Sequence, residues 1–147
     1  MNNLDRRAES LRRGRTSETG RLYLVTAVTL KRNPIFADFK HARLLVNILR
    51  AESSRNQIQT WTYVVMPDHF HWLLRLSDES LSRVVGRVKS LSARQIGHAI
   101  WQDGFHDRAV RMEEDLKGMA RYIIANPIRA GLADSVGDYP HWDAIWL

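Results

Sequence analysis

The chain has 147 residues, of which 44% are hydrophobic and 26% charged, a size and composition typical of one globular domain. The absence of cysteine excludes disulfides, thiolate metal sites and a cysteine nucleophile. No apolar run approaches the roughly 18–20 residues of a membrane helix, so no membrane partner is expected. Lys+Arg number 22 against 16 Asp+Glu, and arginine strongly outnumbers lysine. This balance is compatible with a nucleic-acid partner and equally with a solvated basic surface.

The N-terminal segment is polar and basic. Residues 1–19 contain several arginines and little to bury, which predicts an arm outside the folded core. Residues 20–147 are expected to form one domain. The segment has no apolar leader, and together with the missing cysteines this favours a cytoplasmic location.

The first two elements are predicted to be a strand and a helix. Residues 21–30, RLYLVTAVTL, are rich in β-branched and aromatic types and indicate a strand. Asn33-Pro34 interrupts it. Asp38 is a suitable N-cap for a helix over 38–52 with an apolar face.

The middle of the chain predicts a hairpin followed by a helix and a short strand. Residues 58–66 and 69–76 are two strands close enough in sequence to pair. Ser80 can cap a helix over 81–98, whose apolar residues follow helical spacing. Residues 104–110 are expected to form a fourth strand.

The C-terminal part predicts one more helix and a packed tail. A helix over 112–125 is expected to stop at Asn126-Pro127, because a residue before proline avoids helical dihedrals. The aromatic tail DYPHWDAIWL, residues 138–147, is expected to pack on the body. The order of elements indicates an α+β protein of the ferredoxin-like or RRM-like class, a split β-α-β with an antiparallel sheet of about four strands and an added C-terminal helix.

Two histidines lie two residues apart on the 69–76 strand. Because side chains alternate along a strand, His69 and His71 share one face and Phe70 and Trp72 share the other. The apolar set is a core face, so the imidazoles point away from that core, where mutual repulsion would keep them neutral. The pair can bind a divalent cation or can be an ordinary pair of hydrogen-bonded residues. Without cysteine, zinc would need further ligands from His, Asp or Glu. A site completed by amide or phosphate oxygens better suits Mg²⁺ or Mn²⁺.

Two polar residues lie at the edge of the last helix. Its predicted buried residues are Met112, Leu116, Met119, Ala120 and Ile123. Tyr122 and Asn126, four residues apart, fall on the border of this stripe. There they can face the histidines, with Asn126 as a third ligand, or serve as a core-edge tyrosine and a helix cap.

Together these motifs resemble a known family. MPDHFH at residues 66–71, RYIIANPIRAGL at 121–132 and WQDGFHDRAVR at 101–111 are similar to the REP-associated tyrosine transposases, part of the His-hydrophobic-His (HUH) single-tyrosine nucleases. The resemblance covers nearly the whole chain.

The resemblance implies an enzyme, a metal-dependent single-stranded DNA endonuclease and strand transferase acting beside hairpins of REP-like palindromes. His69, His71 and Asn126 would hold Mg²⁺ or Mn²⁺, and Tyr122 would attack the phosphate to give a 5′-phosphotyrosine. Insertion-sequence relatives carry glutamine where this chain has Asn126. The resemblance also implies a nucleoid-associated protein that acts as a monomer, with a dimer as the alternative.

The remaining candidates concern DNA contacts. The basic residues predicted to bind DNA are Arg12, Arg13, Arg83, Arg87, Lys89 and Arg94. For each of them a solvated charge is the alternative. His106 and Asp107 can support the site or form a structural hydrogen bond, and Trp101, Trp142 and Trp146 can stack bases or close the core.

Two competing functions remain open. A hairpin-binding protein or regulator without chemistry would have the same fold. An RNA-binding domain of this class is less favoured, because the third strand carries histidines where paired aromatic residues would stack bases.

Overall fold

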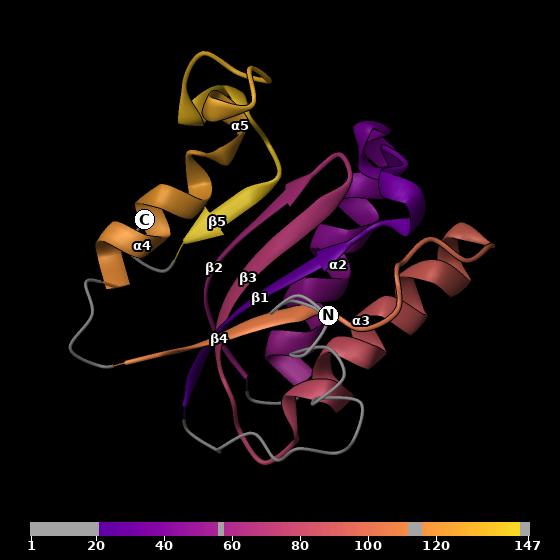
Figure 1. Cartoon of the computed structure of the whole chain (residues 1–147), viewed down its shortest axis with the longest axis vertical. Helices are drawn as coiled ribbons and strands as arrows, with labels where there is room; N and C mark the ends of the chain where they lie inside the picture. Colours follow the sequence, from indigo (N-terminus) through magenta and orange to yellow (C-terminus); the bar gives the residue numbers. More distant parts are fainter. Residues whose placement is uncertain (1–20, 56–57, 112–115, 145–147) are drawn as a thin grey trace, which may run out of the picture.

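The computed structural model describes residues 21–55, 58–111 and 116–144. The strands are β1 (Leu22–Val28), β2 (Gln59–Met66), β3 (His69–Arg75), β4 (His106–Val110) and β5 (Trp142–Ala144). The helices are α2 (Phe39–Arg55), α3 (Leu81–Ile96), α4 (Leu116–Ile124) and α5 (Asn126–Arg129). The five strands form one antiparallel sheet in the order β4-β1-β3-β2-β5 (Figure 1). The predicted α+β class and split β-α-β order are confirmed, with one more strand than the four expected.

Helices α2 and α3 begin at the predicted N-cap residues, Asp38 and Ser80. The Asp38 carboxylate accepts hydrogen bonds from the backbone N–H groups of Lys40 and His41, at 2.8 and 3.2 Å. The Ser80 hydroxyl accepts from the N–H of Arg83 at 3.2 Å. Each cap satisfies N–H groups that the first helical turn leaves without a partner.

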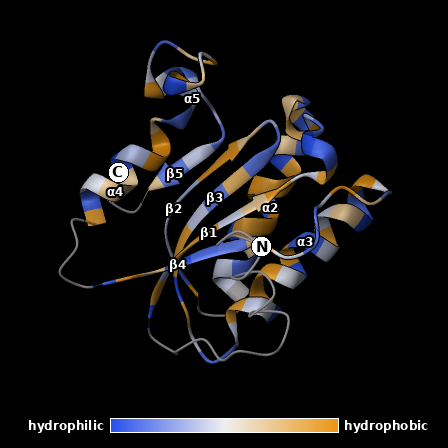
Figure 2. Cartoon of the chain, in the orientation of Figure 1, coloured by the Kyte–Doolittle hydropathy of each residue, from blue (hydrophilic) through white to orange (hydrophobic). Residues whose placement is uncertain are grey.

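The sheet has two covered faces. On one face, α2 and α3 pack on the side chains of Phe70, Trp72 and Leu74 and form the larger core. On the other face, Ile123 of α4 joins Leu73 in a smaller apolar cluster. Figure 1 shows α2 and α3 on one side of the sheet and α4 on the other. Hydrophobic residues follow the central strands, whereas the edge strand β4 is hydrophilic over much of its length (Figure 2).

The tail packs on the body as predicted, and part of it forms β5. Trp142 pairs with Val64 of β2. The Tyr139 hydroxyl donates to the Val65 carbonyl at 2.6 Å, and the Val65 N–H donates to the His141 carbonyl at 2.8 Å. The tail was expected to pack but not to add a strand, because its short run shows no clear alternation. Trp146 lies outside the described residues.

The end of the last helix differs from the expectation. Helix α4 stops at Ile124, close to the predicted end, but α5 follows after Ala125 with Pro127 in its first turn. The N–H groups of Arg129 and Ala130 donate to the carbonyls of Ala125 and Asn126, so helical bonding continues past the proline. Proline is compatible with this position because the first N–H groups of a helix need no intrahelical acceptor.

The described helices include none long and apolar enough to cross a membrane. The arm predicted over residues 1–19, the start of the expected domain at residue 20 and Met112 of the predicted buried stripe lie outside the described residues.

Candidate active site

The two histidines occupy the face of β3 that α4 partly covers. Their neighbours Phe70 and Trp72 are fully buried on the opposite face, as the alternation predicts. The imidazole rings of His69 and His71 lie 4.9 Å apart between centroids and are tilted by 76°. The strand therefore brings two nitrogen donors together outside the larger core.

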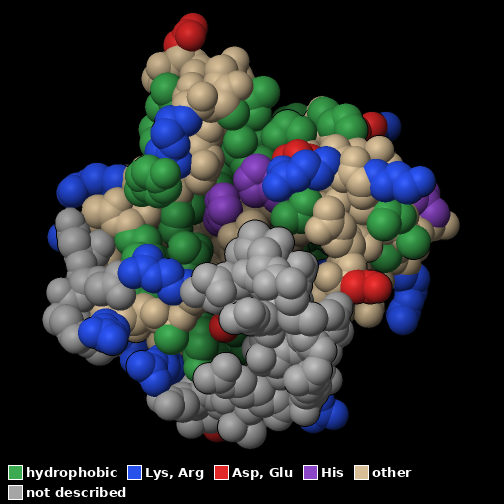
Figure 3. Space-filling view, viewed as in Figure 1, with side chains coloured by type: hydrophobic (Ala, Val, Ile, Leu, Met, Phe, Trp, Pro, Cys, Tyr) green, Lys and Arg blue, Asp and Glu red, His purple; other side chains and the backbone are tan. Residues whose placement is uncertain are grey.

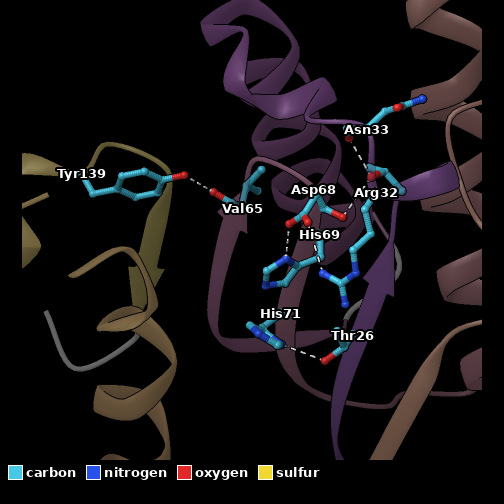
Figure 4. Close-up of polar contacts among 9 residues, drawn as sticks. Thr26, Arg32, Asn33, Val65, Asp68, His69, His71 and Tyr139 are labelled. Carbon is cyan, nitrogen blue, oxygen red and sulfur yellow. Dashed lines mark hydrogen bonds and ion pairs between the residues drawn. The ribbon is translucent and has the colours of Figure 1, made fainter. Parts of the chain in front are cut away.

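His69 is oriented by a carboxylate. Its Nδ1 lies 2.7 Å from Oδ1 of Asp68, and Oδ2 of Asp68 accepts from Nη1 of Arg32 at 3.1 Å (Figure 4). Partial burial raises the pKa of Asp68, but the hydrogen bonds from His69 and Arg32 outweigh it and leave that pKa below its usual value. An ionised Asp68 accepts the Nδ1 proton, so Nε2 of His69 carries the lone pair that can bind a metal.

A strained loop supports Asp68. The buried Thr29 donates through its N–H and its hydroxyl to the Asp68 carbonyl, at 2.9 and 3.1 Å. The same hydroxyl donates to the Asn33 carbonyl at 2.7 Å. Between these anchors Lys31 and Arg32 adopt left-handed dihedrals, with φ of 54° and 53°. Such dihedrals are costly for non-glycine residues and often mark functional sites, and here they put Arg32 beside Asp68.

His71 is bound from the neighbouring strand. Its Nδ1 is hydrogen bonded to the Thr26 hydroxyl at 2.7 Å (Figure 4). Burial, followed by the electrostatic effects of His69 and Arg129, lowers the pKa of His71 to about 4. His71 is therefore neutral at physiological pH, as predicted, and when Nδ1 donates to the hydroxyl its Nε2 is free to act as a ligand.

A polar row extends from His71 across the sheet. Thr26 is the register partner of both His71 and His106, so the three side chains share the face that α4 covers. The Nδ1 atom of His106 is buried without a hydrogen-bond partner among the described residues. The structural hydrogen bond expected for His106 is therefore not seen at this atom.

Tyr122 and Asn126 are joined by a residue that the sequence did not single out. The Tyr122 side chain is 66% exposed, and the guanidinium carbon of Arg129 lies 3.8 Å from the centroid of its ring. Nη2 of Arg129 donates to the Asn126 Oδ1 at 2.9 Å. Ala120 and Ile123 are buried, which confirms those two members of the predicted stripe.

The histidine pair has little direct contact with Tyr122 and Asn126. Among the described residues, the one interaction that links them is the charge of Arg129 acting on His71. Figure 3 shows histidine side chains in a hollow beside the α4–α5 segment. No group of three or more His, Asp or Glu side chains gathers for a metal ion within residues 21–55, 58–111 and 116–144.

The donors present fit the cation expected from the sequence. Two imidazoles, each with Nδ1 already hydrogen bonded, present nitrogen ligands from one strand. Amide or phosphate oxygens would have to complete the coordination, which favours Mg²⁺ or Mn²⁺ over structural zinc. Asn126 is a chemically suitable donor, but its Oδ1 is bound to Arg129 in this structure.

Four of the six basic residues expected to bind DNA lie on α3, on the other side of the sheet. Arg83 and Arg94 are exposed there. Arg87 forms ion pairs with Glu52 and Glu79, which hold the pKa of its guanidinium above its ordinary value. Lys89 donates to the carbonyls of Gln102 and Gly104 at 2.7 and 2.6 Å. DNA binding by these four stays a prediction, and Arg12 and Arg13 lie outside the described residues.

Trp101 and Trp142 have structural roles. The Trp101 ring packs against Phe36 and Phe70, and its Nε1 donates to the Ser92 hydroxyl at 2.9 Å. Nε1 of Trp142 donates to the Val136 carbonyl at 2.9 Å. Both side chains therefore pack within the protein, as expected if they close the core instead of stacking on bases.

Sequence reasoning missed three supporting residues. Thr26 and Arg32 reach the histidine segment from positions distant in sequence, so no local pattern indicates them. Arg129 could have been found from the sequence. It follows Tyr122 by seven residues and Asn126 by three, a spacing that puts side chains on one helical face.

Comparison with known proteins identifies relatives of this chain. Residues 19–126 match the family described as "Transposase IS200 like". A REP-associated tyrosine transposase of Escherichia coli is 33% identical over 91 residues, which cover 57% of this chain and 52% of that protein. A Haemophilus influenzae protein named "Putative REP-associated tyrosine transposase" is 26% identical over 100 residues, which cover 56% of this chain and 57% of that protein. The chain thus spans about half the length of the curated relatives it matches.

A solved structure has the same fold. A REP-associated tyrosine transposase bound to a REP hairpin superposes with a TM-score of 0.75 at 23% identity, over 85% of this chain and 77% of that one. The predicted relationship to these transposases is confirmed. Since the family match covers most of the chain and includes the histidine pair and Tyr122, the protein belongs to the IS200-like transposase family.

Proposed function

We propose that the protein cuts and rejoins single-stranded DNA beside a hairpin, with Tyr122 as nucleophile and the histidine pair as metal ligands. One observation carries the proposal. His69 and His71 present paired nitrogen donors, fixed through Asp68 and Thr26, on the sheet face that the Tyr122 helix covers. The family match supports the same assignment.

The reaction is a phosphoryl exchange. The Tyr122 hydroxyl gives up its proton, and its oxygen attacks the scissile phosphorus and forms a P–O bond. The bond between phosphorus and the 3′ oxygen breaks, and that oxygen takes up a proton and leaves as a hydroxyl. The product is a 5′-phosphotyrosine, and attack by another 3′-hydroxyl reverses the step and joins strands. The high exposure of Tyr122 leaves its hydroxyl accessible to an incoming strand.

A bound Mg²⁺ or Mn²⁺ would neutralise charge on the nonbridging phosphate oxygens. Asp68 and Thr26 fix the two imidazoles before substrate arrives, which reduces the reorganisation needed at the reacting phosphate. Arg32, 63% exposed in its side chain, adds a positive charge beside the pair.

Hairpin DNA is the proposed substrate because the structural neighbour is bound to a REP hairpin and curated relatives carry REP-associated names. The excess of basic residues is consistent with a polyanionic partner. We propose that the protein acts as a monomer in the cytoplasm, associated with the nucleoid.

The test uses oligonucleotides that carry a hairpin flanked by single strands, with Mg²⁺, Mn²⁺ or EDTA. We expect a covalent protein–DNA adduct with either metal, none with EDTA and none for Tyr122→Phe. Tyr63→Phe is a matched control because Tyr63 is a buried residue of β2 whose side chain belongs to the larger core, on the face opposite the histidines. Tight hairpin binding that is indifferent to EDTA, with no adduct under any metal, would instead support the hairpin-binding regulator.

A further inference from the structure

The junction between α4 and α5 leaves two backbone carbonyls without their usual partners. Pro127 has no N–H to donate to the carbonyl of Ile123, four residues earlier. The Nδ2 of Asn126 donates to that carbonyl instead, at 2.8 Å. The carbonyl of Tyr122 accepts from Nη2 of Arg129 at 2.7 Å. Two side chains thus complete the end of α4.

This arrangement fixes the direction of the Asn126 amide. Because Nδ2 is bound to the Ile123 carbonyl, Oδ1 faces away from α4, where Nη2 of Arg129 donates to it at 2.9 Å. An amide oxygen has two lone pairs, so one remains available. The oxygen that would bind a cation is therefore held in place by Arg129.

The same guanidinium holds the tyrosine. Its carbon lies 3.8 Å from the centroid of the Tyr122 ring, a stacked cation–π geometry. One arginine thus contacts the ring of Tyr122, its backbone carbonyl and the Asn126 side chain. The Tyr122 ring has little other restraint, since it is largely exposed.

We propose that Arg129 is a positioning residue that locks Tyr122 and Asn126 to each other, so that nucleophile and amide oxygen approach the histidine pair as one unit. This inference rests on the proposed function for its kinetic consequence. The planar guanidinium is required, because its face stacks on the Tyr122 ring while the two protons of Nη2 donate to the Tyr122 carbonyl and to Oδ1 of Asn126. A lysine retains the charge but lacks the planar guanidinium.

The test compares Arg129→Ala and Arg129→Lys with Arg121→Ala. Arg121 is a matched control because it is an exposed arginine on α4, adjacent to Tyr122, and Arg121→Ala removes the same charge as Arg129→Ala. In steady-state strand joining on the hairpin oligonucleotide, where a second 3′-hydroxyl releases Tyr122, we expect kcat to fall about 10- to 100-fold for both Arg129 variants. KM should change by less than about 2-fold, and Arg121→Ala should keep the kcat of the parent protein.

A second readout needs no activity. In the metal-free protein, the ring current of Tyr122 should shift the Arg129 side-chain protons upfield in NMR spectra, and Tyr122→Ala should abolish that shift. The Asn126 Nδ2 protons should lose protection in Arg129→Ala and in Arg129→Lys but keep it in Arg121→Ala.

The outcomes separate the two proposals. If the parent protein forms no adduct but shows the NMR shifts of the Arg129 protons, the proposed function fails, and the contact of Arg129 with Tyr122 and Asn126 is still supported. If the parent protein forms adduct and Arg129→Ala matches Arg121→Ala in kcat, the positioning role is overturned. It is also overturned if Arg129→Lys restores the parent kcat, because charge alone would then suffice, or if the NMR shifts are missing.

Discussion

The two faces of the central sheet carry different kinds of residue, although they alternate along the same strands. On the α2–α3 face of β3, Phe70, Trp72 and Leu74 are all fully buried. On the α4 face, His69 and His71 are partly accessible and hydrogen bonded to Asp68 and Thr26. One face therefore supplies most of the hydrophobic stabilisation, while the other holds polar groups in fixed orientations. The difference shows how a seven-residue strand can serve stability and chemistry at once.

The largest expected effect comes from substituting a residue of the α4 face, and it is an effect on activity. His69→Ala removes one nitrogen donor from a side chain that is 19% exposed, so adduct formation should fall below detection while stability changes little. Adduct gels with Mn²⁺ and urea unfolding followed by circular dichroism measure the two quantities. Retained adduct formation would show that the histidine face is not the catalytic one.

A substitution on the α2–α3 face should instead affect stability, and Phe70, the residue after His69, lies on that face. Phe70→Ala deletes a fully buried ring from the larger core, and we expect the free energy of unfolding to fall by about 3–5 kcal/mol. The variant that remains folded at low temperature should still form adduct. A loss below about 1 kcal/mol would mean that the core collapses around the gap or that Phe70 is not close-packed.

The pH dependence of stability should also originate on the α4 face. His71 has a pKa of about 4 in the folded protein against 6.5 for the free side chain, so the unfolded chain binds the extra proton between these values. Its contribution to stability is therefore lost as pH falls from 6.5 towards 4. At 1.36 kcal/mol per pKa unit the loss reaches about 3 kcal/mol.

The measurement is urea unfolding in EDTA at a series of pH values. His71→Gln should show a flatter profile over this window than the parent protein. The buried His141, whose pKa is also lowered, remains in both proteins and controls for other histidines. Identical profiles would contradict the assignment of the pH dependence to His71.

A smaller effect is expected from the residue behind His69. Asp68→Asn keeps the size of the side chain but replaces the charged acceptor. Removing the carboxylate that orients a ligating histidine lowers metal affinity about 10- to 100-fold. Mn²⁺ titration by calorimetry measures this change. Asp78→Asn is a control because Asp78 is an exposed aspartate in the loop before α3. Equal Mn²⁺ affinity in Asp68→Asn and the parent protein would mean that Asp68 does not orient His69.

Local sequence patterns accounted for the elements and the orientation of β3. Asp38 and Ser80 start helices as expected because a cap needs only residues two or three positions away. The alternation of His69 to Trp72 assigned both faces because strand geometry fixes it.

The supporting contacts could not be predicted, because they depend on pairing over long sequence separations. Thr26 meets His71 across the β1–β3 register. Arg87 looked like a DNA-binding residue on a helix surface, but the fold brings Glu52 and Glu79 to its guanidinium. Arg32 reaches Asp68 only through a left-handed turn that its sequence does not indicate.

The most direct test of the catalytic assignment is peptide mapping of the covalent adduct. The protein is incubated with the hairpin oligonucleotide and Mn²⁺, digested with trypsin and nuclease, and analysed by mass spectrometry. We predict a residual 5′-nucleotide on the peptide Tyr122–Arg129, attached at Tyr122, and dependent on His69 and His71. A nucleotide attached to any other residue, or an adduct that forms equally well in His69→Ala, would contradict the assignment of the α4 face as the site of chemistry.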